Sequence, residues 1–253
     1  MLYAADFKQK ARESLKGNWG KAVGTGLLAA LLGAGTTVIT VSSGSSYSSE
    51  VESISELNGV VPAEFQLIYL AILSIIGFIT LVISLVHFAM GGVITLGYAK
   101  FNLKLADKKP ASVADLFSEF HRFIAGFLMQ LLRTVYIFLW SLLFIIPGIY
   151  ASYGYALTPY VLLENPKMTA NEAITESKRL MDGNRFRLFC LEMSFIGWAL
   201  AAGLFTLGIG VIWLKPYMEA SFAAFYREIK AEKYGREDKE EQPYEGFYNG
   251  YTV

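Results

Sequence analysis

Long apolar runs constrain this chain more than any other feature of its 253 residues. They lie at about 21–41, 65–97, 123–146, 148–163, 187–207 and 209–226. A helix needs about 20 apolar residues to cross the hydrocarbon core of a bilayer, and most of the runs are long enough. Hydrophobic residues make up 54% of the chain and charged residues 17%, which are too few to cover the surface of a soluble protein. The sequence therefore predicts an all-α, polytopic helical membrane protein.

Lysine and arginine between the runs predict the topology, because these residues are retained on the cytoplasmic side. They are Lys8, Lys10, Arg12, Lys16 and Lys21 at the start, Lys100, Lys104, Lys108 and Lys109 after the second run, Lys167, Lys178, Arg179, Arg185 and Arg187 before the fifth, and Arg227, Lys230, Lys233 and Arg236 at the end. The stretch 42–64 contains glutamates but no lysine or arginine, so we expect it outside. About six spans then form three hairpins, with both termini cytoplasmic.

Pro147 and Gly148 interrupt the apolar segment 138–163 near its middle. Because the loops on either side are predicted to be cytoplasmic, this segment crosses the membrane an even number of times. Proline presets φ and glycine accepts a positive φ, so the pair predicts a tight turn within a helical hairpin over 123–163. A re-entrant hairpin that turns back at mid-depth satisfies the same charge rule. Gly208 to Gly210 predict the outer turn of the last hairpin.

The second run is longer than one crossing requires. It is either a tilted helix or a helix that breaks at Gly91–Gly92 and continues along the inner surface. Residues 1–230 are expected to form the membrane domain, and 231–253 a disordered cytoplasmic tail, because this tail is charged and then rich in Tyr and Gly. Gly20 with Gly24 and Ala199 with Gly203 have the spacing that permits close helix packing.

Short amphipathic surface helices are predicted before the hairpins. Thr169 with Glu172 matches a capping box, and two further pairs resemble it. These are Ser112 with Asp115 and Asp6 with Gln9. Gly17–Asn18 and Gly183–Asn184 follow the first and last of these helices, where a left-handed residue commonly ends a helix. We expect such helices to lie on the inner leaflet.

Motifs of soluble enzymes are absent from the sequence. It contains no phosphate-binding loop, no hydrolase nucleophile elbow and no HExxH, and its only histidines are His87 and His121. We therefore expect no catalytic residue, no metal and no cofactor. The net formal charge is zero, so no nucleic acid partner is expected either.

Four ionisable residues fall within predicted spans: Arg133, Glu192, Lys215 and Glu219. A charge near the middle of a bilayer costs at least about 2.5 kcal/mol, so such residues usually pair with each other or face a polar cavity. Pro216 lies between two of them and should act as a hinge. One interpretation is a polar pathway or a site for an anionic headgroup. The other is a buried ion-pair network that fixes how the helices pack.

Several motifs resemble a bacterial family of uncharacterised integral membrane proteins, the domain-of-unknown-function 975 family. They are Ala11, Gly17-Asn18-Trp19, Ile146-Pro147-Gly148-Ile149, and the segment from Ser177 to Gly183. More distantly, the chain resembles the membrane domain fused to some glycerophosphodiester phosphodiesterases. The resemblance implies a polytopic membrane protein and no catalytic residue, and the acidic and His metal site of the phosphodiesterase has no counterpart here.

Two functions remain open from the sequence. A non-enzymatic scaffold or accessory membrane protein would use the intramembrane charges for structure and bind a membrane protein partner. A carrier or lipid-handling protein would use Arg133 and Lys215 to bind an anionic lipid or a solute. The lipid bilayer is the expected environment in both cases.

Overall fold

The computed structural model describes residues 3–34, 63–206 and 209–240, and all regular elements in these ranges are helical. The α-helices are α1 (Ala4–Leu15), α2 (Trp19–Leu31), α4 (Ala63–Ala106), α5 (Phe123–Leu143), α6 (Ile145–Gly154), α7 (Thr158–Glu164), α8 (Ala170–Met181), α9 (Arg185–Phe205) and α10 (Gly210–Glu240), with 3-10 helices η2 (Val113–Leu116) and η3 (Phe120–Arg122). The all-α class is thus confirmed for this part of the chain. The predicted outer loop at 42–64 falls almost wholly outside the described residues.

Helix α4 is one uninterrupted helix of 44 residues, so of the two alternatives for this run the break at Gly91–Gly92 does not occur. These glycines instead bring other helices close to α4. A Cβ at Gly92 would lie 2.2 Å from the carbonyl oxygen of Gly126 on α5, and a Cβ at Gly91 would lie 2.8 Å from that of Gly33. Neither contact leaves room for a side chain, because a Cβ does not approach an oxygen this closely. Glycine therefore fixes where α5 and the end of α2 cross α4.

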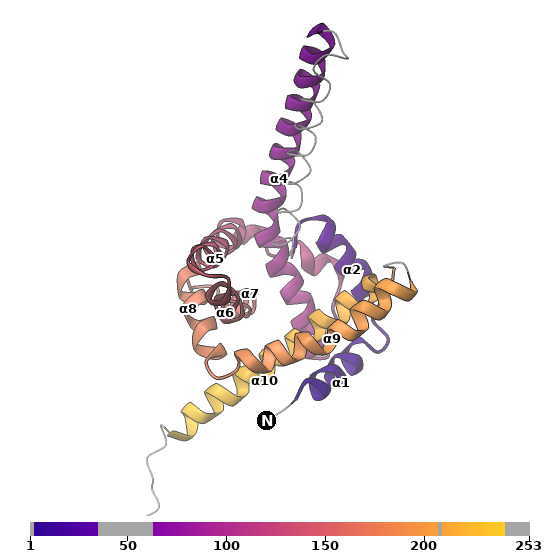
Figure 1. Cartoon of the computed structure of the whole chain (residues 1–253). Helices are drawn as coiled ribbons and strands as arrows, with labels where there is room; N and C mark the ends of the chain where they lie inside the picture. The colour runs from indigo at the N-terminus through magenta and orange to yellow at the C-terminus, as the bar shows by residue number, and fades with distance from the viewer. Residues whose placement is uncertain (1–2, 35–62, 207–208, 241–253) are drawn as a thin grey trace, which may run out of the picture.

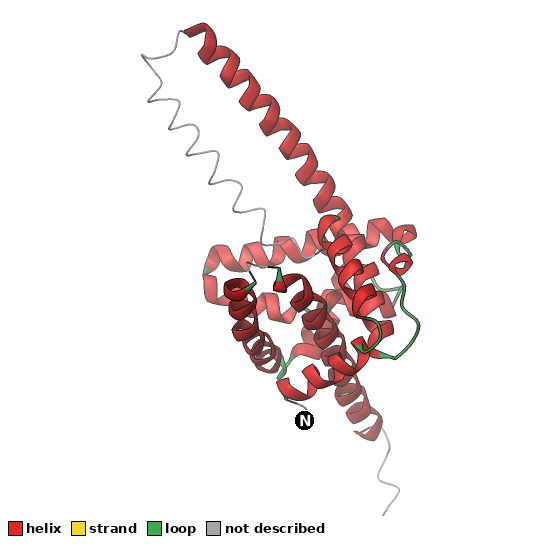
Figure 2. Cartoon of the chain, turned by 90° about the vertical axis from the view of Figure 1, so that its right-hand side faces the viewer, coloured by secondary structure: helices red, strands yellow, loops and turns green. Residues whose placement is uncertain are grey.

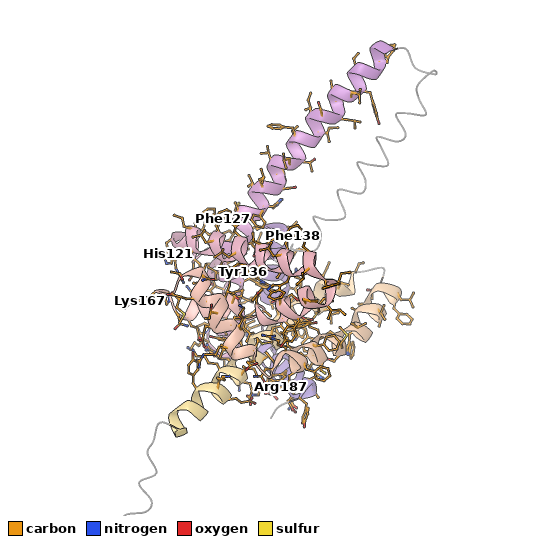
Figure 3. All side chains as sticks on the ribbon, turned by 60° about the vertical axis from the view of Figure 1, so that its left-hand side comes forward. His121, Phe127, Tyr136, Phe138, Lys167 and Arg187 are labelled. Atoms are coloured by element: carbon orange, nitrogen blue, oxygen red, sulfur yellow. The ribbon has the colours of Figure 1, made fainter. Side chains whose placement is uncertain are left out.

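The core lies where the C-terminal half of α4 meets the other helices. Its largest fully buried side chains come from α1, α4, α9 and α10 and include Phe7, Phe101, Phe195, Phe225 and Tyr226. We call this part of the molecule the body. Figure 3 shows Arg187 at the end of the body opposite the exposed N-terminal half of α4.

Three helical segments extend from the body with apolar side chains exposed. They are 65–86 of α4, the α5–α6 turn with its flanks (138–150), and the α9–α10 turn with its flanks (196–206 and 209–213). Phe78, Ile146 and Phe205 are 67%, 80% and 82% exposed. Figures 1 and 2 show that these three apolar ends point away from the body in different directions. Apolar surface of this extent is unfavourable in water and is compatible with burial in a bilayer.

Three helical segments of the described chain are long and apolar enough to cross a membrane: Ile68–Ala106, Val113–Leu143 and Arg185–Phe205. The six predicted spans are therefore not supported. The predicted span 148–163 is divided between α6 and α7, which are 10 and 7 residues long, and α2 has 13 residues. The predicted span 209–226 is the first half of α10, where Lys215 and Glu219 interrupt the apolar sequence.

A helical hairpin does form over α5 and α6, but its turn lies at Phe144 rather than at Pro147–Gly148. Phe144 alone has an extended backbone, with φ −160° and ψ 152°, between the two helices. Pro147 is in the first turn of α6, where a missing N–H removes no helical hydrogen bond. A Cβ at Gly148 would lie 2.2 Å from Ser141 Oγ, so this glycine permits α6 to pack against α5.

The last hairpin turns between Phe205 and Gly210, as predicted, although Leu207 and Gly208 lie outside the described residues. Gly210 N donates a hydrogen bond to Thr206 Oγ1 at 2.7 Å, which joins the two ends of this turn. Helix α10 then continues to Glu240. The predicted tail boundary at 231 was therefore wrong, because residues 231–240 are helical. Residues 241–253 lie outside the described part of the chain.

The predicted capping pairs agree with the structure at α8 and differ at the other two positions. Thr169 Oγ1 accepts from Glu172 N at 3.3 Å, and Glu172 Oε2 accepts from Thr169 N at 2.7 Å, so the capping box of α8 is confirmed. Ser112 and Asp115 begin only the four-residue η2, not an α-helix. Asp6 occupies the third position of α1 and accepts from Tyr3 N at 2.7 Å, so it is not the cap itself.

Both predicted helix ends at Gly-Asn pairs are confirmed. Gly17 and Gly183 have φ values of +80° and +74°, in the left-handed region that glycine adopts without strain. Each directly follows the C-cap residue of its helix, α1 or α8. The chain therefore changes direction at equivalent points before α2 and α9.

Candidate functional site

All four intramembrane charges predicted from the sequence line one cavity. Arg133 comes from α5, Glu192 from α9, and Lys215 and Glu219 from α10. The cavity has a volume of about 180 Å³ and lies within the body, between α4, α5, α9 and α10. We call it the central cavity. Both interpretations of the sequence require these four residues to meet, and their convergence depends on how α5, α9 and α10 pack.

The cations of the central cavity make no ion pair with its carboxylates in the described part of the chain. Arg133 Nε is buried and has no hydrogen-bond partner there. Glu219 nevertheless interacts electrostatically with Arg133, Lys215 and Glu192, so the four groups share one field. This arrangement differs from a tight ion-pair network, in which each charge would be held by direct contact.

Two tyrosines on other helices complete the polar lining. Tyr98 on α4 is 5% exposed, and its hydroxyl is buried without a hydrogen-bond partner among the described residues. Tyr160 on α7 also lines the cavity and stacks on Tyr226 at 5.2 Å between ring centroids. Tyr98 was not among the residues predicted from the sequence. Its signal was its place directly after an apolar run, which is also typical of a tyrosine at a membrane interface.

Glu192 differs from the other charges because it has a direct partner. Tyr153 on α6 donates a hydrogen bond from its hydroxyl to Glu192 Oε2 at 2.5 Å. The same tyrosine packs edge-on against Phe189 one turn earlier on α9. Glu192 is therefore fixed in position by the α5–α6 hairpin, whereas Glu219 has no such bond in the described part of the chain.

The three predicted hinge residues do not lie together. Pro147 and Gly148 are near the start of α6 and do not line the central cavity. Pro216 is buried inside α10, directly after Lys215, and packs 3.4 Å from the position of a Cβ on Gly26 of α2. A hinge function for Pro216 remains a prediction, but the residue does connect the cavity wall to α2.

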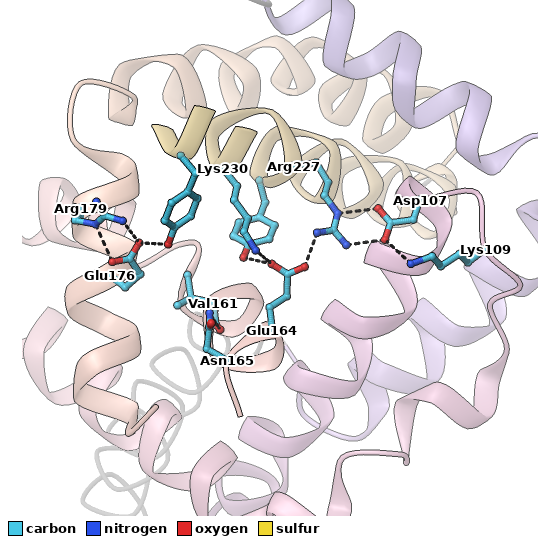
Figure 4. Close-up of polar contacts among 11 residues, drawn as sticks. Asp107, Lys109, Val161, Glu164, Asn165, Glu176, Arg179, Arg227 and Lys230 are labelled. Carbon is cyan, nitrogen blue, oxygen red and sulfur yellow. Dashed lines mark hydrogen bonds and ion pairs between the residues drawn. The ribbon is translucent and has the colours of Figure 1, made fainter. Parts of the chain in front are cut away.

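A second polar cluster lies on the body and joins α4, α7 and α10. Arg227 donates to both carboxylate oxygens of Asp107, at 2.7 and 2.6 Å, and also to Glu164. Lys230 and the Tyr226 hydroxyl donate to Glu164 at 2.6 and 2.5 Å. Figure 4 shows Arg227 between Asp107 and Glu164. We call these residues the basal network, and their satisfied bonds identify it as structural.

The basal network also determines the protonation of its members. Burial raises the pKa of Glu164, but the hydrogen bonds from Lys230, Tyr226 and Arg227 together outweigh it, so the pKa lies below its usual value. Burial likewise opposes the charge of Arg227, and its bonds to Asp107 and Glu164 raise the pKa of the guanidinium instead. Both groups are therefore held in their charged forms.

The central cavity presents two cations, two carboxylates and two phenol hydroxyls, which are groups that can bind a polar ligand. No group of three or more His, Cys, Asp or Glu side chains is placed to hold a metal within the described residues. The free thiol of Cys190 does not line the cavity.

Comparison with known proteins identifies one family. The family model described as "Protein of unknown function (DUF975)" matches residues 1–149 and 142–233. No curated protein and no solved structure matches the chain. The resemblance to a domain-of-unknown-function family is thus confirmed, whereas the similarity to the membrane domain of glycerophosphodiester phosphodiesterases is not shown.

Proposed function

This chain belongs to the DUF975 family, and we propose that it is a non-enzymatic, multi-pass membrane protein whose central cavity binds a small ligand through a phosphate or carboxylate group. The observation that carries the proposal is that Arg133 and Lys215 both face the cavity without an ion pair in the described residues. The ligand is the headgroup of a lipid or a free solute with the same chemistry. This is the carrier or lipid-handling function rather than the scaffold.

Desolvation explains why this arrangement favours a ligand. Removing a charge from water costs several kcal/mol, and a direct, well-oriented partner is needed to offset that cost. Arg133 has no such partner in the described chain, and its guanidinium offers paired donors that match a phosphate or a carboxylate. An anion in the cavity would supply the missing bonds. The buried hydroxyl of Tyr98 provides a further donor to the same space.

The two carboxylates limit what the site would accept. Glu192 and Glu219 balance the charges of Arg133 and Lys215, so the cavity has no excess positive charge to hold a highly charged anion. A ligand with one anionic group, or with an ammonium group as well, suits this balance better than a polyphosphate. The cavity volume of about 180 Å³ is also suited to a small group.

The distribution of basic residues supports a multi-pass topology with cytoplasmic termini. The basal network joins α4, α7 and α10 through residues that follow or flank the predicted inner loops. Its cations Arg227 and Lys230 therefore belong to a segment for which the retention of basic residues predicts the cytoplasmic side.

Native mass spectrometry of the gently extracted protein tests the proposal. We expect the wild type to retain a defined anionic small molecule or lipid, Arg133→Gln to lose it while remaining folded, and Lys109→Gln to retain it. Lys109 is a suitable control because its side chain is 66% exposed and lies outside the cavity. The retained mass distinguishes a lipid from a solute. A stoichiometric protein partner with no retained ligand in any form would instead support the scaffold.

A further inference from the structure

A second hollow lies between α1, α2, α9 and α10, separate from the central cavity. It has a volume of about 350 Å³, and we call it the tryptophan groove. Its lining includes Lys8 and Arg12 of α1 together with Trp19, Trp198 and Trp213. None of these residues lines the central cavity. The groove therefore combines two cations with three indole rings on one surface.

The two cations lie close together without a carboxylate to balance them. Lys8 Nζ donates to the carbonyl of Ser194 at 2.7 Å and lies 4.4 Å from the centroid of Phe195. Arg12 Nε donates to Tyr217 Oη at 3.1 Å, which leaves its two terminal nitrogens available. Neither side chain makes an ion pair within the described ranges, whereas the neighbouring Lys10 pairs with Glu228 at 2.9 Å.

The lowered pKa of Lys8 agrees with the absence of a carboxylate partner for Lys8 and Arg12 in the described residues. Burial lowers the pKa of its ammonium group, and the nearby charge of Arg12 lowers it further. An anion between the two side chains would remove the repulsion. The groove thus has a specific electrostatic reason to bind a negative group at the α1 end.

The tryptophans make the other end of the groove largely apolar. Trp19 packs 6.3 Å from Trp213 and 6.3 Å from Tyr217, measured between ring centroids. Trp198 and Trp213 are 64% and 53% exposed and lie on the apolar α9–α10 end. The groove therefore leads from a cationic helix of the body to a surface suited to lipid chains. Indole rings favour this position at the boundary between headgroups and chains.

We propose that the tryptophan groove binds one anionic phospholipid, with its phosphate against Lys8 and Arg12 and an acyl chain along the tryptophans. An anionic lipid fits better than a zwitterionic one, because the groove provides two cations and no carboxylate for an ammonium group. A free phosphate would use only the α1 end and leave the apolar wall uncovered. The proposal concerns residues outside the central cavity, so it stands or falls independently of the proposed function.

Tryptophan fluorescence provides the test, because three of the chain's four tryptophans line the groove. Trp140→Phe removes the fourth and serves as the reference protein. It is placed in nanodiscs of unlabelled phosphatidylcholine that contain a small, equal fraction of brominated phosphatidylglycerol or brominated phosphatidylcholine. Each basic residue near an anionic headgroup contributes about 1 kcal/mol, which is roughly a fivefold preference. With two such residues, we expect the anionic lipid to quench at about a 25-fold lower mole fraction.

Matched variants of the reference protein distinguish a specific lipid site from non-specific electrostatic attraction to anionic lipids. Lys8→Gln with Arg12→Gln should remove the preference for phosphatidylglycerol. Lys16→Gln with Lys21→Gln changes the net charge equally, at exposed residues outside the groove, and should retain it. Equal quenching by both lipids in the reference protein overturns the proposal without any variant. An equal loss in both double variants also overturns it, because the preference is then diffuse electrostatics.

Discussion

Arg133 on α5 and Glu219 on α10 line the same cavity, interact electrostatically, and form no ion pair in the described part of the chain. Opposite charges that are buried together usually form direct ion pairs when they stabilise the fold. The basal network shows what such contact looks like in this protein, since Arg227 binds Asp107 and Glu164 directly. The described part of the chain thus contains one charge cluster with direct ion pairs and one without them, and the second lines the central cavity.

The contact of Gly92 with Gly126 predicts a steric effect on stability. Gly92→Ala should lower the free energy of unfolding by about 1–3 kcal/mol, because its Cβ would lie 2.2 Å from a backbone oxygen that cannot rotate away. Gly77→Ala in the same helix has no atom within 4 Å of its Cβ and should be neutral or slightly stabilising. Thermal melting of both variants in one detergent checks this. Equal melting temperatures would contradict a close backbone contact between α4 and α5 at Gly92 and Gly126.

The capping box of α8 predicts a smaller loss. Thr169→Ala removes the side-chain acceptor for Glu172 N and should cost about 1 kcal/mol. Thr175→Ala is the matched control, because its hydroxyl bonds only to the carbonyl of Asn171 within the same helix. Alanine is the better helix former there, so the control should not destabilise. Urea titration of both variants measures the difference, and an equal loss at both positions would contradict the capping assignment.

The lowered pKa of Glu164 predicts a pH dependence of stability. A carboxyl group with a depressed folded pKa stabilises the fold above its unfolded value of about 4.3, and this contribution is lost as the pH falls through the folded value. Glu164→Gln should therefore be less stable than wild type at pH 7, and the difference should shrink below about pH 4. Melting curves from pH 7 to pH 3 measure it.

Glu13→Gln provides the control for this pH series. The side chain of Glu13 accepts an exposed hydrogen bond from Gln9 on the same helix, so its substitution should change the melting temperature little at any pH. A constant difference between Glu164→Gln and wild type across the whole range would contradict the assignment of Glu164 as a stabilising carboxylate.

The predicted topology can be tested with single cysteines, because Cys190 is the chain's only cysteine. In a Cys190→Ser background, Ser46→Cys should react with a membrane-impermeant thiol reagent in intact cells. Tyr248→Cys should react only after the membrane is opened. The physical reason is the retention of basic segments on the cytoplasmic side. Labelling of both positions from the outside would place the C-terminus on the wrong side for our proposal.

The candidate site was largely predictable from the sequence, whereas the hairpin geometry was not. Arg133, Glu192, Lys215 and Glu219 stand out because a charge in an apolar run is costly wherever the run folds. Their convergence on one cavity brings together residues as far apart in the sequence as Arg133 and Glu219, and local patterns do not encode this. Tyr98 was missed because tyrosine at the end of an apolar run is also common at a membrane interface.

The glycines also show that local sequence patterns do not predict which helices come into contact. The spacing of Gly20 with Gly24 suggested a close contact, yet a Cβ added at either position would have no atom within 4 Å in the described chain. The close contacts occur at Gly92, Gly126 and Gly148 instead. Glycine has both a conformational and a steric use, and its sequence position alone does not distinguish them. The turn at Phe144 escaped prediction for a related reason, since Pro147 is equally suited to the first turn of a helix.

A double-mutant cycle between Arg133 and Glu219 tests the central claim most directly. The unfolding free energies of wild type, Arg133→Gln, Glu219→Gln and the double variant are measured in detergent after lipids and solutes are removed. If Arg133 is an unpaired, ligand-facing charge, Arg133→Gln should be as stable as the ligand-free wild type or more stable, with a coupling energy below about 1 kcal/mol. A loss of about 3–5 kcal/mol in Arg133→Gln that Glu219→Gln restores would instead identify a structural ion pair and contradict the ligand site.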